Sequence, residues 1–274
     1  MRAALYNGQK SIEMTELPTP EAGENDIVVK NIYASICGTD VAVYEHGPGT
    51  GHRITVGSEF GHEMVSEVVQ VGKNVKDIKL GDRVYPYPRL AKGDPKRAGT
   101  IGIAAAIALK YFGCHKVMIC DHSDFRLNKA KELGFEICNN GQEELKAKSK
   151  QVFGCAMSAL GETCDVDIYI DAAGADGIIE NYQSMGKINS RMVVVAVKAG
   201  LRPIDVLAMT YGQHAIIGSG GYFPEDVWDV MAIMKSRKWD IESIITDVYP
   251  WEQLPQAIEK ASRVDEALDV VIQY

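Results

Sequence analysis

Three side chains in the first quarter of the sequence are of types that bind a divalent metal. Cys37 stands in ASICGTD, and His62 and Glu63 stand in GSEFGHE. A thiolate, an imidazole and a carboxylate form a mixed donor set of the kind that Zn²⁺ accepts. A catalytic zinc keeps one position open for water or substrate, and an alcohol bound there loses its proton more easily. The sequence therefore predicts a catalytic metal site at Cys37, His62 and Glu63.

Two polar residues close to Cys37 are predicted to assist that chemistry. Thr39 offers a hydroxyl that can relay the proton of the alcohol, and Asp40 offers a carboxylate that can hold His62 in one tautomer. Thr39, Asp40 and Glu63 are therefore the predicted catalytic residues. Ordinary explanations stay open, because a single cysteine usually packs in a core. A His–Glu pair is likewise usually a surface charge pair.

A glycine turn that leads into a helix, AGTIG at residues 98–102, is typical of a dinucleotide-binding fold. Gly99 and Gly102 fit the second and third glycines of G-x-G-x-x-G. The second lets the backbone approach a pyrophosphate, and the third lets the helix pack closely on the sheet. The start of the helix offers free N–H groups to the phosphates. Arg97 stands at the position of the first glycine. The predicted phosphate-binding residues are Gly99, Thr100, Ile101 and Gly102.

An acidic residue follows at the distance where such folds bind a ribose. Asp121 closes the next predicted strand, 19 residues after Gly102. A carboxylate there accepts the ribose hydroxyls and repels a 2′-phosphate, so NAD is predicted rather than NADP. Arg126 either lies along the adenine or caps the helix region. Gly174, in the DAAG turn after a later predicted strand, completes the predicted cofactor site.

Two parts of the chain, which differ in their predicted secondary structure, are expected to position these residues. The first part contains β-rich runs such as IVVKNIYASI at 27–36 and predicts a small β-barrel or sandwich. From residue 98, strands alternate with helices, which predicts a doubly wound parallel sheet and an α/β fold class. The tail returns to strand-like sequence. The predicted domains are 1–97 together with 243–274, and 98–242.

Composition excludes several classes of protein. The 274 residues are 46% hydrophobic and carry a net charge of −8, which suits one large or two ordinary domains. Negative charge repels phosphate backbones and anionic membranes, so neither nucleic acid nor a membrane is an expected partner. The N-terminal residues lack the apolar core of a signal peptide. Six scattered cysteines without CxxC pairs predict reduced thiols in a cytoplasmic protein.

The order of several motifs resembles the zinc-dependent medium-chain alcohol and polyol dehydrogenases. These motifs are CGTD, GHE, VGKNVKDIKLGDRV, the glycine turn and CDHSDFRLNKAKELG, and SICGTDVAVYEHG is most similar to the sorbitol-type branch. The resemblance implies a GroES-like β-barrel catalytic domain joined to a Rossmann domain. It implies NAD-dependent oxidation of a polyol or other secondary alcohol by a homodimer or homotetramer. It also implies Cys37, His62 and Glu63 as zinc-site residues, Thr39 as the proton relay and Asp40 as the partner of His62.

Between GDRV and the glycine turn, this chain is shorter than the resemblance implies. Gly81 and Gly99 are only 18 residues apart. Relatives carry there a four-cysteine structural zinc lobe and the first Rossmann strand, so one catalytic zinc and no structural zinc are expected. KGDPKR at 92–97 cannot replace a strand that is buried mid-sheet, because its charges would be unpaired and Pro95 lacks a donor.

Three explanations of the short segment stay open. An ordinary segment is absent only from the recorded sequence, the chain has a true internal deletion, or LGDRVYPYP at 80–88 is recruited as the missing strand. Two other functions also stay open. One is an inactive or crippled deletion variant that binds metal without turnover. The other is a zinc-free, quinone-reductase-like NAD(P)H oxidoreductase, which the intact Cys37, His62 and Glu63 set disfavours.

Overall fold

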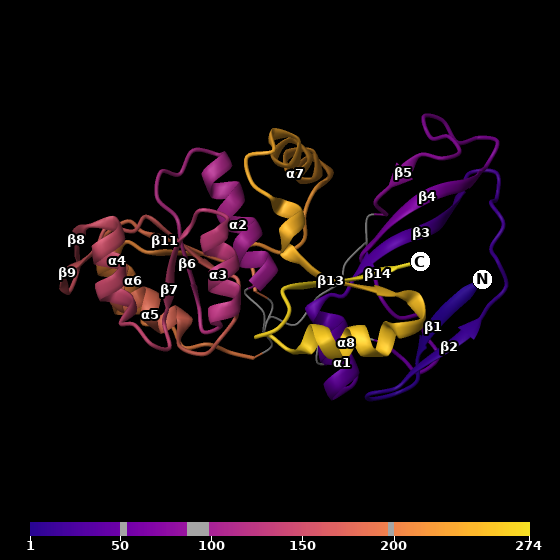
Figure 1. The fold of residues 1–274 in the computed structure, drawn as a ribbon. Coiled ribbons are helices and arrows are strands. Elements are labelled where there is room, and N and C mark those ends of the chain that lie inside the picture. Colours follow the sequence, from indigo (N-terminus) through magenta and orange to yellow (C-terminus); the bar gives the residue numbers. More distant parts are fainter. Residues whose placement is uncertain (50–53, 87–98, 197–199) are drawn as a thin grey trace. The chain divides into compact units, whose positions relative to one another are not determined.

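A computed structural model describes residues 1–49, 54–86, 99–196 and 200–274 of the chain (Figure 1). It forms two compact units, each described here by itself. Unit 1 consists of Met1–Gly93, Ile245–Arg263 and Asp269–Tyr274, and unit 2 consists of Asp94–Ile244 and Val264–Leu268. The predicted domain boundary between residues 97 and 98 lies outside the described residues, as do Arg97 and KGDPKR.

Unit 1 is built on a five-stranded sheet with the order β13-β14-β3-β4-β5. Its strands are β3 (Ile27–Ser35), β4 (Met64–Val71), β5 (Arg83–Val84), β13 (Ile245–Pro250) and β14 (Asp269–Gln273). Only β13 and β14 pair in parallel within this sheet. A separate antiparallel hairpin is formed by β1 (Arg2–Tyr6) and β2 (Ile12–Glu16). The β-rich character expected of the first part of the chain is confirmed.

Two helices accompany these strands, α1 (Gly38–His46) and α8 (Leu254–Ser262). The buried residues of α8 recur at helical spacing, which gives the helix one apolar face that packs against other elements of unit 1. They are Leu254, Ala257, Ile258 and Ala261. In α1, by contrast, every residue from Thr39 to Tyr44 is buried. The backbone that follows Cys37 is therefore held on all sides.

The recruitment of LGDRVYPYP into the Rossmann sheet is wrong for the residues that the structure describes. Arg83 and Val84 form β5, which pairs antiparallel with Glu67 and Ser66 of β4 in unit 1. The last two residues of that run, 87 and 88, lie outside the described residues. This segment therefore finishes the sheet of unit 1.

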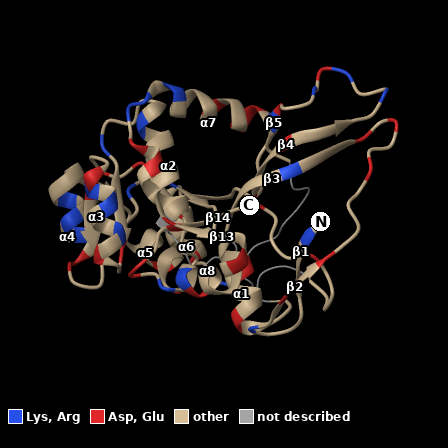
Figure 2. Cartoon of the chain, turned by 45° about the vertical axis from the view of Figure 1, so that its right-hand side comes forward, with Lys and Arg blue, Asp and Glu red and all other residues tan. Residues whose placement is uncertain are grey.

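Unit 2 alternates strands and helices, as expected from the sequence. Its strands are β6 (Met118–Asp121), β7 (Glu136–Asn139), β8 (Cys155–Ser158), β9 (Gly161–Cys164), β10 (Ile168–Asp171), β11 (Arg191–Val194) and β12 (Ala215–Gly218). Its helices are α2 (Gly99–Tyr111), α3 (Asp124–Glu132), α4 (Leu145–Phe153), α5 (Ile178–Met185), α6 (Val206–Gly212) and α7 (Pro224–Ser236). Figure 2 shows that α7 begins with acidic and ends with basic residues, which complements the helix dipole.

The parallel strands of unit 2 form two sheets. β6 pairs in parallel with β7, and β10 pairs in parallel with β11, which pairs in parallel with β12. Within the described residues, no ladder joins β6 to β10. A doubly wound sheet in the order 3-2-1-4-5-6 has its first strand at this place. The predicted α/β architecture is therefore observed. No described strand, however, lies at its central position, between β6 and β10.

Packing in unit 2 centres on the glycine-turn helix. Ile103, Ala106 and Ile107 of α2 are buried in one cluster with residues that include Val117 and Phe135. None of the helices in the described parts of the chain is both long and apolar enough to cross a membrane.

Candidate active site

The register of unit 1 brings the two predicted metal-binding fragments together. Ala34 at the end of β3 pairs with Met64 at the start of β4. Cys37 follows β3 and caps the start of α1, whereas His62 and Glu63 directly precede β4. Because antiparallel neighbours place the end of one strand beside the start of the next, these three residues meet at one edge of the sheet.

One ligand atom from each of Cys37, His62 and Glu63 lies within 4.8 Å of the other two. Donors bound at about 2.0–2.3 Å to a tetrahedral Zn²⁺ lie about 3.5 Å from one another. A contraction of about 1 Å would therefore suffice to place all three around one ion. All three residues are half-buried, so the cluster is shielded from water and still accessible. The residues present fit a zinc ion with a fourth position left for another ligand.

Asp40 holds both the histidine and the cysteine backbone. Nδ1 of His62 lies 3.2 Å from Oδ1 of Asp40, and Oδ2 of Asp40 accepts a 3.0 Å hydrogen bond from the N–H of Cys37. Asp40 is only 2% exposed. The hydrogen bond that the ring donates to the carboxylate of Asp40, followed by its hydrogen bond with Cys37, raises the pKa of His62 to about 11. This raised pKa favours the protonated form of the imidazole, which has to lose its proton to bind a metal ion.

Thr39 lies against the other nitrogen of the same ring. Its Oγ1 is 3.3 Å from Nε2 of His62, and the residue is 3% exposed. Between them, Asp40 and Thr39 set the orientation of the imidazole. The structure thus places all five predicted residues of the metal half in one cluster.

One neighbour of the cluster was not found from the sequence. Asp269 begins β14, next to β3, and its Oδ1 accepts a 2.8 Å hydrogen bond from the hydroxyl of Ser35. Burial raises the pKa of Asp269. The pKa of Glu63 is also raised, mainly by burial and to a lesser extent by the charges of Asp40 and Asp269, against the lowering effect of His62. No motif marks Asp269, because only the pairing of the C-terminal strand with β3 brings it here.

In unit 2, four predicted cofactor residues line one cavity of about 1420 Å³. Gly102, Asp121, Arg126 and Gly174 all border it. Asp121 ends β6 and Gly174 follows the end of β10. One end of the cavity therefore lies beside the carboxyl ends of parallel strands, where open α/β sheets bind ligands, and the cavity continues along both strands to Met118 and Ile168.

Asp121 and Arg126 are already engaged in local structure. Oδ1 of Asp121 accepts hydrogen bonds from the N–H groups of His122 and Ser123, at 2.7 and 3.0 Å. Its second oxygen makes neither bond. Arg126 is buried, and burial lowers its pKa, opposed by the charges of Asp121 and Asp265. Arg126 therefore packs beside the predicted ribose position and not on an exposed surface.

Two residues of the glycine turn, Thr100 and Ile101, lie away from this cavity. Oγ1 of Thr100 donates a 3.0 Å hydrogen bond to the carbonyl of Leu268, and Ile101 is exposed. Neither of these two residues lines the cavity. A Cβ at Gly102 would lie 4.0 Å from that of Ala172, an ordinary contact. The close packing of helix and sheet at Gly102 therefore stays a prediction, and α2 contacts both β6 and β10 in the described residues.

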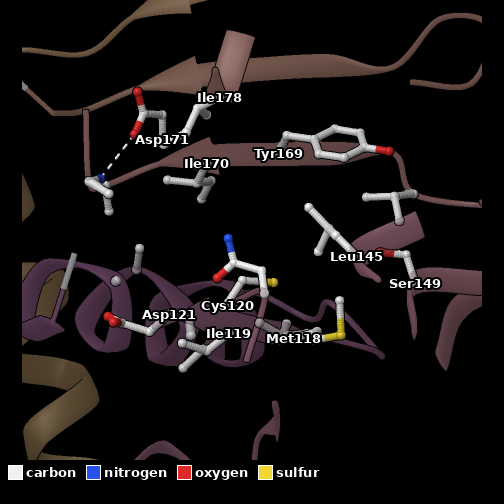
Figure 3. Close-up of a pocket in the computed structure, with 18 of the residues that line it drawn as sticks. Met118, Ile119, Cys120, Asp121, Leu145, Ser149, Tyr169, Ile170, Asp171 and Ile178 are labelled. Carbon is white, nitrogen blue, oxygen red and sulfur yellow. Dashed lines mark hydrogen bonds between the residues drawn. The ribbon is translucent and has the colours of Figure 1, made fainter. Parts of the chain in front are cut away.

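Gly174 adopts the turn that the sequence indicates. Its φ is 63°, and its N–H donates a 2.7 Å hydrogen bond to Oδ1 of Asp171. Figure 3 shows Asp171 at the end of β10 with its carboxylate turned back toward this loop.

Two family models match the chain. The model described as zinc-binding dehydrogenase matches residues 100–236, and the model described as alcohol dehydrogenase GroES-like domain matches residues 23–127. The first match lies in unit 2. The second covers the metal cluster of unit 1 and extends into unit 2.

Curated and solved proteins of similar kind align over nearly the whole chain. The L-threonine 3-dehydrogenase of Yersinia pestis (strain Pestoides F) is 24% identical over 97% of both proteins. The 2R,3R-butanediol dehydrogenase from Bacillus subtilis has a TM-score of 0.83 at 18% identity, covering 100% of this chain and 99% of that one. An alcohol dehydrogenase from Escherichia coli CFT073, complexed with NADH, has a TM-score of 0.81 at 19% identity, with coverage of 100% and 99%.

Proposed function

Because this chain belongs to the zinc-binding dehydrogenase family, we propose that it oxidises a polyol or other secondary alcohol with NAD. It is a zinc-dependent oxidoreductase that acts on alcohols, and the class of alcohol and the choice of NAD are the proposed parts. The observation that carries the proposal is the cluster of Cys37, His62 and Glu63 donor atoms, all within 4.8 Å of one another.

The residues of the cluster have distinct tasks in this reaction. When bound, zinc supplies Lewis acidity that makes the hydroxyl of an alcohol more acidic, and NAD accepts the hydride. Cys37, His62 and Glu63 would hold the metal. Asp40 faces Nδ1 of the imidazole, and Nε2, which lies 3.3 Å from the hydroxyl of Thr39, would bind the metal. The hydroxyl of Thr39, on the Nε2 side of the ring, would carry the proton of the alcohol away.

The preference for NAD over NADP rests on Asp121. Its carboxylate lies at the end of β6 and borders the cavity, with one oxygen bound to the N–H groups of the following turn. The second oxygen would accept hydrogen bonds from ribose hydroxyls, and the negative charge would repel a 2′-phosphate. Asp121→Ala should therefore lower the ratio of kcat/KM for NAD to kcat/KM for NADP. Initial-rate kinetics with each cofactor measures this ratio.

Metal analysis tests the proposal most directly. Purified protein should contain about one zinc per chain by mass spectrometry of the metal, and show alcohol-dependent formation of NADH. Cys37→Ser should lose most of both, whereas Cys155→Ser, at an exposed cysteine of unit 2, should keep both. A folded protein without zinc would contradict the proposal. A quinone-reductase-like enzyme would instead keep quinone reduction in Cys37→Ser.

A second candidate function is metal binding without turnover, which the break between β6 and β10 favours. Without a backbone ladder between β6 and β10, the residues beside the predicted ribose position would bind the dinucleotide with lower affinity. The metal cluster of unit 1 would be unchanged. Titration with NADH, followed by its fluorescence, separates the two candidates. Absence of binding at millimolar NADH, in zinc-loaded and folded protein, would support the second.

Cell location and assembly complete the proposal. The six cysteines are all free thiols, which supports a cytoplasmic protein. A homodimer or homotetramer is proposed from the family resemblance. The outer strand β12 of unit 2 would be available for pairing between copies.

A further inference from the structure

Two cysteines of unit 2 lie directly opposite each other in neighbouring strands. Cys120 of β6 is the register partner of Cys138 of β7 in their parallel ladder. Partners in a ladder direct their side chains to the same face of the sheet, and neighbouring strands lie about 4.8 Å apart. Disulfides join residues whose Cα atoms are about 4.4–6.8 Å apart. The backbone of this pair is therefore already spaced for a disulfide.

The two sulfur atoms also face each other. Both cysteines are free thiols, and their side chains are hydrogen-bonded to each other. This hydrogen bond lowers the pKa of Cys138, because the S–H of Cys120 stabilises the thiolate. Once one of the two protons has left, the other is shared, so either sulfur can carry the negative charge. A thiolate is the form that attacks another disulfide.

The two thiols differ in their access to small molecules. Cys138 is 0% exposed, whereas Cys120 is half-buried and borders the cavity of unit 2, where Figure 3 shows it among the lining residues. A small oxidising molecule can therefore reach Cys120 first. Cys138 then lies in place as the second thiol.

A second pair of cysteines in unit 2 is arranged differently. Cys155 and Cys164 are also register partners, in the β8–β9 hairpin. The sulfur of Cys164, however, lies 3.4 Å from the hydroxyl of Tyr169 and 3.7 Å from the carbonyl oxygen of Met185. The sulfur of Cys155 is hydrogen-bonded to Glu162. The two pairs therefore share their register but differ in the direction of their sulfur atoms, which makes the second pair an internal comparison.

We propose that Cys120 and Cys138 form a thiol–disulfide modification site that a low-molecular-weight disulfide, such as glutathione disulfide, oxidises. The thiolate of Cys120 attacks one sulfur of this reagent, which releases one thiol and leaves a mixed disulfide on Cys120. The thiolate of Cys138 then attacks the sulfur of Cys120 and releases the second thiol. The two protons and two electrons that the protein loses are carried by the two released thiols.

A disulfide at this place would link the two strands beside the turn at residues 122–124. Asp121 follows Cys120 and accepts the N–H of His122, and Asn139 follows Cys138 and donates a 3.3 Å hydrogen bond to the carbonyl of His122. A covalent link between β6 and β7 would keep the strands that carry these contacts from separating. The inference depends on neither zinc nor turnover, because both cysteines lie in unit 2.

Peptide mapping of the full chain tests the proposal. Zinc-loaded protein without dinucleotide is incubated with millimolar glutathione disulfide, and the remaining thiols are alkylated before digestion. A peptide pair linked through Cys120 and Cys138 should appear, with a loss of about 2 Da from the intact chain, and a reductant should reverse both. Cys155→Ser, as the matched control, should form the same link.

Hydrogen exchange tests whether the link holds the strands together. Exchange in residues 118–121 and 136–139 should be at least about tenfold slower in the oxidised chain than in the reduced chain. Cys120→Ser, treated in the same way, should show neither the link nor the slower exchange. Slower exchange that survives in Cys120→Ser would contradict the assignment.

Four results of the mapping and exchange experiments would overturn the proposal. They are the absence of the link between Cys120 and Cys138, a glutathione adduct that persists on Cys120, a link between Cys155 and Cys164 in its place, and unchanged exchange in linked protein. These results are all obtained on the unaltered chain, so they decide the question even if Cys120→Ser does not fold.

Discussion

At the scale of single residues, Asp40 links the two halves of the metal cluster. One oxygen faces Nδ1 of His62 and the other accepts the N–H of Cys37, while the side chain is almost fully buried. A buried carboxylate that orients a histidine ligand is as much a part of a metal site as the ligand itself. The sequence predicted Asp40 as the partner of His62, whereas its hydrogen bond with the N–H of Cys37 was not predicted.

Replacement of Asp40 should show whether this residue orients His62 for zinc binding or only stabilises the fold. Asp40→Asn keeps an oxygen that can accept the N–H of Cys37, but it removes the charge that faces His62. Zinc affinity should fall about 10–100-fold, as measured by competition with a chromophoric chelator. Two controls are measured. One is the thermal unfolding of metal-free Asp40→Asn protein, and the other is the zinc affinity of Asp229→Asn, which changes an exposed acid. Unchanged affinity in Asp40→Asn would contradict the positioning role.

Zinc binding should release a proton from His62. The pKa of this imidazole is raised to about 11 in the metal-free cluster, so at pH 8 the ring is protonated and must lose its proton to bind. Affinity should therefore rise at least about tenfold per pH unit between pH 7 and 9, because a thiol ligand also binds zinc as its thiolate. The ¹⁵N chemical shifts of the His62 ring at pH 8, with and without zinc, report its proton directly, and a neutral ring before zinc is added would refute the assignment.

At the scale of elements, the sequence predicted the alternation of strands and helices in unit 2 but not every element. In unit 2, β7, the β8–β9 hairpin, α5 and α6 were not predicted, and in unit 1 neither was α1. The run GTDVAVYEH contains β-branched residues that do not favour a helix, and burial within unit 1 together with the Asp40 contact to Cys37 outweighs that preference. Tertiary contacts of this kind are not visible in a local pattern.

A close backbone approach at the end of β4 explains one glycine. A Cβ on Gly72 would lie 2.2 Å from the carbonyl oxygen of Gly23 and 2.6 Å from the backbone of Glu24. Gly72→Ala should therefore lower the free energy of unfolding by about 1–3 kcal/mol, as measured by urea denaturation. Gly218→Ala, where nothing lies within 4 Å, should change it by less. Equal effects of the two substitutions would show that the backbone at Gly72 moves away from the added Cβ without a loss of stability.

At the scale of the whole molecule, the motif order predicted which residues meet, because β3 and β4 are neighbours in sequence and in the sheet. The short segment before the glycine turn predicted a gap in the Rossmann sheet. What it could not predict is how the strands around the gap would settle, since that depends on packing between distant elements. The outcome, two sheets around a cavity, follows only from the structure.

Removal of the metal should affect one unit and spare the other. All three donor residues lie in Met1–Gly93, so bound zinc stabilises unit 1 by about 2.7 kcal/mol when free zinc is a hundredfold above the dissociation constant. Scanning calorimetry with and without a chelator should therefore shift one transition and leave a second in place. A uniform shift of a single transition would show that the two units unfold together.

In the described residues, no backbone ladder joins the sheet of β6 and β7 to the sheet of β10, β11 and β12. Native-state opening is cooperative within contiguous units of structure, and a ladder is what makes two strands open together. The two sheets of unit 2 should therefore open as separate foldons, each with its own free energy of opening.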